Sequence, residues 1–170
     1  KTRVGIIGLG GVAKAHLQAF DEVEQVTLVA VCDVQAEVAS AIAEQYKAKA
    51  YTDYNQMLTE SDLDLVMVLT PASTHRQIVE AVAQAGVAVF CEKPIAVTLD
   101  DAQAMVACCQ SAGVKLFYGS CYRYLPAVIK AQELIRSEAI GKIQLMTEQL
   151  IGGNGYDSYR QLAPIHYPIG

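Results

Sequence analysis

The chain has 170 residues, of which 52% are hydrophobic, 18% charged and 7% aromatic. This composition excludes an intrinsically disordered chain and allows one well-buried domain with part of a second. The net charge of −5 argues against a surface for nucleic acid or anionic membranes, because no segment concentrates lysine and arginine.

The cysteines fit reduced thiols better than a disulfide framework. They are odd in number, form no C-x-x-C pair and include two adjacent residues: Cys32, Cys91, Cys108, Cys109 and Cys121. The same pattern gives no zinc site, and we expect no metal. Apolar runs end before the roughly 18 residues of a membrane helix, and no basic-then-apolar leader precedes them. We therefore expect a soluble, cytoplasmic protein.

Short apolar segments rich in β-branched residues alternate with stretches of helical spacing. The predicted strands cover residues 3–8, 26–33, 64–70, 87–92 and 114–119. Nearly continuous apolar strands are typical of a sheet that is covered on both faces. The alternation predicts an α/β fold with a doubly wound parallel sheet.

Apolar spacing, a capping residue and two glycines predict where individual helices begin and end. Apolar residues at helical spacing predict helices over 102–109 and near 125–137. Asp100 is the predicted N-cap of the first of these helices. Gly86 and Gly113 each stand where a helix is expected to end before a strand begins.

The pattern changes in the last third of the chain. Residues 141–153 alternate like a strand with one polar face, and a lone amphipathic strand cannot bury its apolar face by itself. We place the domain boundary at residue 121, with one domain over 1–121. Residues 122–170 are expected to hold a connecting helix and the first part of a second domain, in a natural chain that continues further.

A glycine-rich turn follows the first predicted strand. It reads G-x-G-x-x-A from Gly8 to Ala13, and a helix comes next. In such a turn the first glycine allows the bend, Gly10 lets a pyrophosphate approach the backbone, and a small third residue lets the helix pack closely. Asp33, at the end of the second strand, is placed to accept hydrogen bonds from ribose hydroxyls. The predicted cofactor-binding residues here are Gly8, Gly10, Gly11, Val12, Ala13 and Asp33; the alternative is a plain turn without a nucleotide.

The residues after Asp33 bear on which dinucleotide binds. Val34 and Gln35 offer no arginine that would hold a 2′-phosphate, which favours NAD. NADP remains possible, because a basic residue from elsewhere in the chain would serve the same purpose.

A charged pair leaves the strand over 87–92 as Glu92-Lys93-Pro94. Ligands of open α/β sheets bind at the carboxyl ends of the strands, so we expect Lys93 to project toward the cofactor crevice. The alternative is a solvated strand exit with no role in binding.

Taken in order, several segments resemble the glucose-fructose oxidoreductase, inositol dehydrogenase and MocA family (Gfo/Idh/MocA). They are "GIIGLGGVAKAH", "VAVCD", "VLTPASTH", "CEKP", "YRYLP" and "IGKI", within residues 2–153. The resemblance implies a Rossmann domain followed by a second domain that covers the nicotinamide and often forms the oligomer interface. It also implies hydride transfer between NAD(P) and a hydroxyl or carbonyl of a sugar, cyclitol or related compound.

The resemblance assigns roles to individual residues. Lys93 is the implied catalytic residue near the reacting oxygen, Glu92 helps to position it, and the peptide before Pro94 is implied to be cis. "TPASTH" resembles the family's T-P-N-x-x-H, which places Thr70, Pro71 and His75 along the cofactor cleft. Two points stay open: Ala72 replaces the usual Asn, and His75 also fits a packing or capping role.

The substrate end of the site is less complete. Tyr122 and Arg123 match the segment that reaches toward the nicotinamide and substrate, although Arg123 also fits a surface ion pair. The family's second-domain Asp and His, about four residues apart, have no D-x-x-x-H counterpart in this sequence. His166 is the nearest candidate, but its flanking prolines argue against a helix.

Two interpretations therefore stay open. One is an NAD(P)-dependent dehydrogenase or reductase that acts on a small polyhydroxy compound and assembles as a homo-oligomer through its second domain. The other is a catalytically incomplete dinucleotide-binding module, a sensor or a fragment. A thiol redox role is a third and weaker alternative, suggested only by the nearness of Cys91 to Lys93 in the sequence.

Overall fold

The protein is described from a computed structural model, in which residues 1–147 are placed. Contacts divide the chain into two units, Lys1–Ser120 and Cys121–Gly170.

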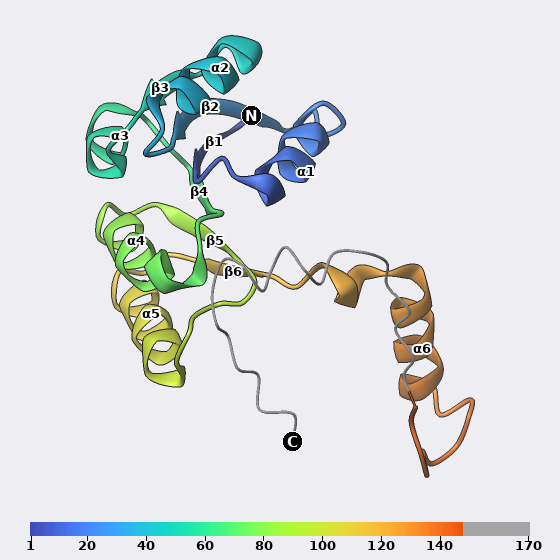
Figure 1. Ribbon diagram of the computed structural model, residues 1–170. Helices are drawn as coiled ribbons and strands as arrows, with labels where there is room; N and C mark the ends of the chain where they lie inside the picture. The colour runs from blue at the N-terminus through green and yellow to red at the C-terminus, as the bar shows by residue number, and fades with distance from the viewer. Residues whose placement is uncertain (148–170) are drawn as a thin grey trace. The chain divides into compact units, whose positions relative to one another are not determined.

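The first unit alternates strands with helices along its whole length (Figure 1). In chain order the elements are β1 (Thr2–Ile7), α1 (Gly11–Phe20), β2 (Val26–Cys32), α2 (Ala36–Tyr46), β3 (Lys49–Tyr51), α3 (Tyr54–Glu60), β4 (Leu65–Val68), α4 (Ala72–Gln84), β5 (Ala88–Glu92), α5 (Leu99–Ser111) and β6 (Leu116–Gly119). All five predicted strands are present, and the short strand β3 was not predicted.

The strands form one parallel sheet in the order β3-β2-β1-β4-β5-β6. This is the strand order of the doubly wound dinucleotide-binding fold, and it confirms the predicted fold class. β1 pairs with β2 on one side and with β4 on the other, so the winding reverses between β1 and β4. The turns after β1, β2, β4 and β5 consequently meet at the carboxyl edge of the sheet.

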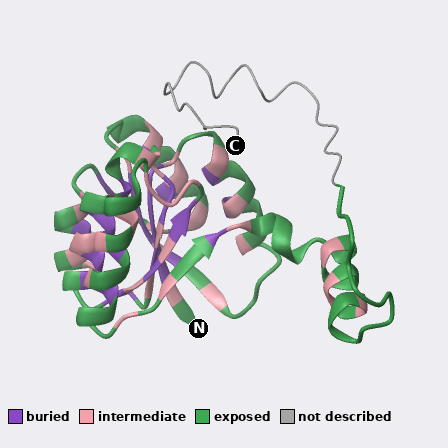
Figure 2. Cartoon of the chain, turned by 90° about the horizontal axis from the view of Figure 1, so that it is seen from below, coloured by how far each residue is buried: buried purple, intermediate pink, exposed green. Residues whose placement is uncertain are grey.

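Buried residues, purple in Figure 2, gather in the strands of the sheet, and their side chains form a core on each face. On one face, Ile7 and its neighbours pack against α3, α4 and α5. On the other face, Ile6 and its neighbours pack against α1 and α2. Because consecutive strand residues point to opposite faces, one short strand contributes to both cores.

The end signals of two helices are confirmed and one start signal is wrong. Gly86 and Gly113 adopt φ angles of 76° and 68° just after α4 and α5, as glycine stops do. The N-cap of α5 is Thr98 and not Asp100. Thr98 Oγ1 accepts from the Asp101 amide (3.1 Å) and donates to Asp101 Oδ2 (2.7 Å), a reciprocal pairing that Asp100 lacks.

The second unit begins with the 3₁₀ helix η1 (Cys121–Tyr124) and the helix α6 (Pro126–Arg136), which confirms the helix predicted near 125–137. Residues 141–147 are exposed and form neither helix nor strand, so the strand predicted over 141–153 is wrong for that part. An alternating segment needs neighbouring strands to pair with before it becomes a strand. The rest of that segment lies outside the described residues.

No helix within residues 1–147 is both long enough and apolar enough to cross a membrane.

The core predicts how two neighbouring residues of α5 respond to truncation. Met105 is fully buried against the sheet, whereas Val106 is 40% exposed. We expect Met105→Ala to lower the free energy of unfolding of the complete protein by about 2–5 kcal/mol. Val106→Ala should change it by less than about 1 kcal/mol. Urea unfolding followed by circular dichroism measures both, and equal effects would contradict the described packing of α5.

Candidate functional site

The turn after β1 is packed against the turn after β4. Gly8 has a φ of +91°, and a Cβ there would lie 2.8 Å from the amide nitrogen of Thr70 and 2.9 Å from the carbonyl carbon of Leu69. Both the conformation and the space therefore require glycine. This approach brings two turns together at the point where the strand order reverses, which is where ligands bind in such sheets.

The space beside Gly10, the next glycine of the motif, is open, whereas the space beside Gly8 is filled. Gly10 is the N-cap residue of α1, and a Cβ added there would meet nothing within 4 Å. No side chain among residues 1–147 caps this helix, so no side chain takes the place of a ligand at its first-turn amides, those of Gly11 and Val12. Ala13 is fully buried under the turn, as the motif requires. Free amides at a helix N-terminus beside open space fit a dinucleotide pyrophosphate.

Asp33 follows β2 at the same edge of the sheet. Its Oδ2 accepts from the Leu9 amide (2.8 Å), and its Oδ1 accepts from the Gln35 amide (3.0 Å). The carboxylate therefore holds the glycine turn while it stays partly exposed. Each oxygen keeps a further lone pair with which it can accept from a ribose hydroxyl.

The segment after β4 forms the facing wall. Pro71 is exposed as the N-cap residue of α4, and Thr70 is half-buried before it. His75 is 1% exposed, with Nε2 2.7 Å from the main-chain oxygen of Thr70 and Nδ1 3.1 Å from that of Ile95. Because both ring nitrogens face main-chain oxygens, His75 ties the turn after β4 to the loop after β5.

The Glu92-Lys93-Pro94 turn leaves β5 at this edge. Glu92 is 8% exposed, and its Oε2 accepts a short hydrogen bond from the Lys93 amide. The side chain of Lys93 is exposed, and the Lys93–Pro94 peptide is cis, as the family resemblance implies. The edge thus carries a buried carboxylate, followed directly in the chain by an exposed lysine.

One residue at this edge received no role from the sequence. His16 of α1 lies with Nε2 3.3 Å from Glu92 Oε1, and its ring meets that of Phe90 edge-on at a centroid distance of 5.5 Å. His16 is the last residue of the segment "GIIGLGGVAKAH". Nothing in the sequence indicates that its partner, Glu92, lies 76 residues away.

The remaining predicted residues belong to the second unit. Tyr122 and Arg123 lie in η1 and are exposed, so their approach to the crevice stays a prediction. His166 lies outside the described residues.

Cys91, two residues before Lys93, is shielded from solvent. Cys91 is fully buried, with Sγ 3.2 Å from His75 Nδ1. Burial, together with the charge of Glu92, raises the pKa of the Cys91 thiol to about 12. Burial likewise raises the pKa of Cys32 to about 11, with smaller effects from Asp53 and Asp33. Because the thiolate is the reactive form, this argues against a thiol redox role for either residue.

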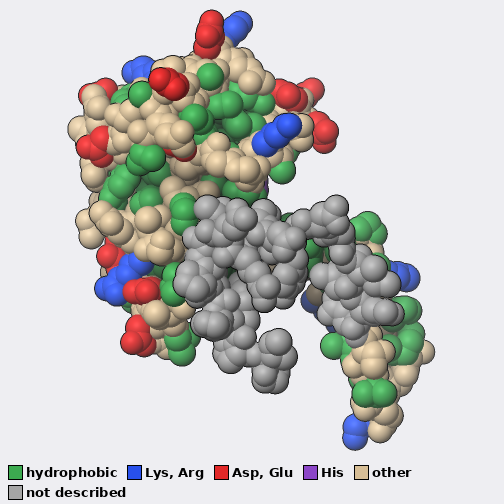
Figure 3. Space-filling model, viewed as in Figure 1, with side chains coloured by type: hydrophobic (Ala, Val, Ile, Leu, Met, Phe, Trp, Pro, Cys, Tyr) green, Lys and Arg blue, Asp and Glu red, His purple; other side chains and the backbone are tan. Residues whose placement is uncertain are grey.

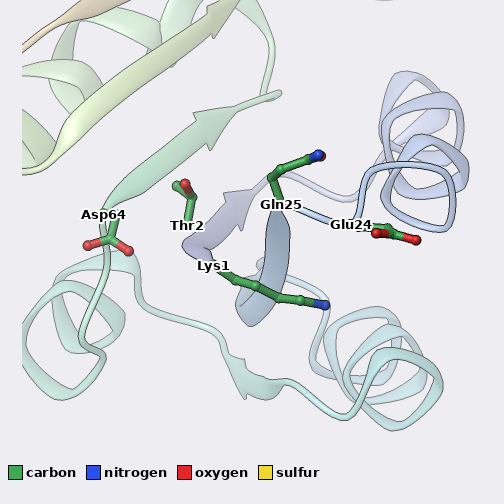
Figure 4. Close-up of a pocket in the computed structure, with 5 residues that line it drawn as sticks. All are labelled: Lys1, Thr2, Glu24, Gln25 and Asp64. Atoms are coloured by element: carbon green, nitrogen blue, oxygen red, sulfur yellow. The ribbon is translucent and has the colours of Figure 1, made fainter.

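A hollow also exists at the opposite edge of the sheet. Five residues at the amino ends of the strands line about 590 Å³ (Figure 4): Lys1, Thr2, Glu24, Gln25 and Asp64. Its position, away from the carboxyl ends, argues against a cofactor site.

On the face of the molecule drawn in Figure 3, the lysine and arginine side chains of the described residues lie dispersed among acidic ones and form no basic patch.

The strand order, the glycine turn at the switch point and the acidic residue after β2 define a dinucleotide-binding α/β domain. Residues 2–120 match the model of the oxidoreductase family with an NAD-binding Rossmann fold, GFO_IDH_MocA. The chain belongs to this family, which confirms the resemblance.

Curated relatives and solved structures agree with this assignment. The chain is 40% identical over 137 residues to D-apiose dehydrogenase of Paraburkholderia graminis, covering 80% of this chain and 36% of that protein. It is 33% identical over 144 residues to inositol 2-dehydrogenase of Salmonella typhimurium, covering 82% and 43%. The WlbA dehydrogenase of Bordetella pertussis, solved with NADH and UDP-GlcNAcA, superposes with a TM-score of 0.80 at 30% identity, covering 84% and 44%. The chain thus spans about two fifths of the length of these proteins.

The two motif glycines predict opposite outcomes when alanine replaces them. Gly8→Ala should destabilise the complete protein by at least about 2 kcal/mol, because the positive φ and the contact with Thr70 are both unfavourable. Gly10→Ala should change stability by less than about 1 kcal/mol, since its Cβ meets open space. Thermal unfolding measures both changes.

The same Gly10→Ala variant tests the position of the pyrophosphate. Its methyl group would occupy the space beside the first turn of α1, so the Kd for NADH should rise at least about tenfold. A fluorescence titration with NADH measures the affinity. Unchanged affinity would show that the pyrophosphate does not pass over this turn.

Proposed function

We propose that the complete protein is an NAD(P)-dependent oxidoreductase that transfers a hydride between the nicotinamide and a hydroxyl or carbonyl of a sugar, cyclitol or related compound. The observation that carries this proposal is the placement of Lys93 and Glu92 at the same sheet edge as the glycine turn. The named activities of the apiose and inositol dehydrogenases support the substrate class.

Different residues of the first unit would bind different parts of the cofactor. The pyrophosphate would lie over Gly10, Gly11 and Val12, and Asp33 would accept from the adenosine ribose. Thr70, Pro71 and His75 would form or support the facing wall, with Gly8 and Ala13 shaping the turn beneath. When bound, NAD supplies a nicotinamide ring that takes up or releases a hydride at C4.

Lys93 would accept or donate the proton whose transfer accompanies that of the hydride. In the oxidation of an alcohol, the carbon gives up a hydride while the hydroxyl loses a proton, and a neutral amine at Lys93 accepts that proton. In the reverse direction, the ammonium group returns the proton to the carbonyl oxygen as the hydride arrives. Glu92 would fix the turn from which Lys93 extends, through its hydrogen bond with the Lys93 amide.

The second unit would contribute the substrate side of the site. Large apolar side chains are exposed along η1 and α6 and just after them: Tyr122, Tyr124, Leu125, Ile129, Ile135 and Ile140. Exposed apolar side chains gathered in this way are typical of a surface that packs against another part of a protein. We propose that residues 122–170 begin a substrate domain whose remaining part covers it, brings Tyr122 and Arg123 to the nicotinamide, and forms a homo-oligomer.

A cytoplasmic location belongs to the same proposal. It is supported by the absence of any disulfide among the described cysteines, all of which are free thiols in residues 1–147. The acidic balance of the chain favours small-molecule partners over nucleic acid.

A Lys93→Ala variant of the complete natural protein tests the enzymatic proposal. Wild-type protein should bind NADH or NADPH and reduce NAD⁺ with D-apiose, myo-inositol or another polyol. Lys93→Ala should lower kcat by about a hundredfold or more and leave the Kd for NADH within about threefold. Lys115→Ala, which removes an exposed lysine at the amino end of β6, should leave both unchanged.

Three other outcomes of these measurements would each contradict a different part of the proposal. Unchanged turnover in Lys93→Ala would remove Lys93 from the mechanism. Dinucleotide binding without turnover on any polyol would favour the catalytically incomplete module. Absence of saturable binding of both dinucleotides would contradict the site itself.

A further inference from the structure

His16 lies at the carboxyl edge of the sheet, and the proposed cofactor binding gives it no role. Its side chain is 23% exposed and reaches from α1 across to the end of β5, where Glu92 Oε1 lies 3.3 Å from its Nε2. The ring also packs edge-on against Phe90 of the same strand. The contact therefore links the helix that begins at the glycine turn to the strand that ends at Glu92, the residue before Lys93.

The carboxylate between these two elements has both oxygens engaged. Glu92 Oε2 accepts from the Lys93 amide, and Oε1 faces His16. Its side chain is only 10% exposed, so water offers little compensation for a lost partner. A buried carboxylate with one oxygen unpartnered pays a desolvation penalty and turns toward any other donor within reach.

We propose that His16 is a positioning residue, which holds the Glu92 carboxylate and, through it, the Lys93 turn in register with helix α1. This rests on the proposed role of Lys93. The arrangement ties the two ends of the dinucleotide site together: the helix that faces the pyrophosphate also orients the turn that carries the lysine. His16 itself need not touch the cofactor or the substrate.

Simple packing is the competing explanation, because the His16 ring also covers Phe90. Two substitutions separate the two roles. His16→Gln keeps an N–H donor within reach of Glu92 and loses the ring, whereas His16→Phe keeps a ring against Phe90 and loses the donor. Positioning predicts that Gln preserves the function and Phe does not, and packing predicts the reverse.

The first measurement needs no substrate. In complete protein labelled with ¹⁵N-lysine, the Lys93 amide is assigned from its loss in Lys93→Arg and should resonate downfield, since it donates to a carboxylate. We expect His16→Phe to move this amide proton upfield by several tenths of a part per million. His16→Gln and a control on the exposed side of the same helix, Gln18→Ala, should leave it in place.

The second measurement follows turnover and cofactor affinity separately. His16→Phe should lower kcat by about tenfold while the Kd for NADH stays within about twofold, and His16→Gln should restore kcat to within about threefold of wild type. A variant that was merely destabilised would lose affinity as well and would not be rescued by Gln.

Two results would overturn the proposal. One is a Lys93 amide that stays in place in His16→Phe, and the other is an equal displacement in His16→Gln and His16→Phe. If wild-type protein fails to bind NADH, the proposed function fails, while the amide measurement still decides whether His16 holds the Lys93 turn through Glu92.

Discussion

The close approach of Gly8 to the Leu69–Thr70 peptide holds the turn after β1 against the turn after β4. Only a glycine permits this approach, because the backbone has a positive φ and no space for a Cβ. The amides at the start of α1, the carboxylate of Asp33 and the segment from Thr70 take their positions from it. The dinucleotide site is therefore a consequence of one backbone contact at the switch point of the sheet.

Hydrogen bonds between side chains and the backbone join these turns. Asp33 binds the Leu9 amide, His75 faces the main-chain oxygens of Thr70 and Ile95, and Glu92 binds the Lys93 amide. In each case a partly or fully buried side chain holds the backbone of a turn at the carboxyl edge of the sheet. The residues that the family resemblance assigns to cofactor binding thus have a structural task in addition.

The sequence predicts the parts of the fold that have strong local patterns. The five strands are recognisable because their apolar runs are nearly continuous, although the edge strand β6 leaves Phe117 and Tyr118 exposed. The glycine turn is recognisable because its spacing is that of a known motif and Gly8 has a steric reason. β3 has only three residues, two of them exposed, and shows no pattern. Thr98 and Asp100 are both plausible caps, and only the reciprocal bonds with Asp101 decide between them. The contact of His16 with Glu92 joins residues 76 positions apart, which no local pattern encodes.

In the proposed site, one edge of the sheet carries both the dinucleotide and Lys93, the lysine that serves its nicotinamide. A crystal structure of the complete protein with NADH bound tests it most directly. We expect the pyrophosphate against the amides of Gly11 and Val12, the adenosine ribose hydroxyls at Asp33, and the nicotinamide ring beside Lys93. A dinucleotide bound elsewhere, or one whose nicotinamide points away from Lys93, would contradict it.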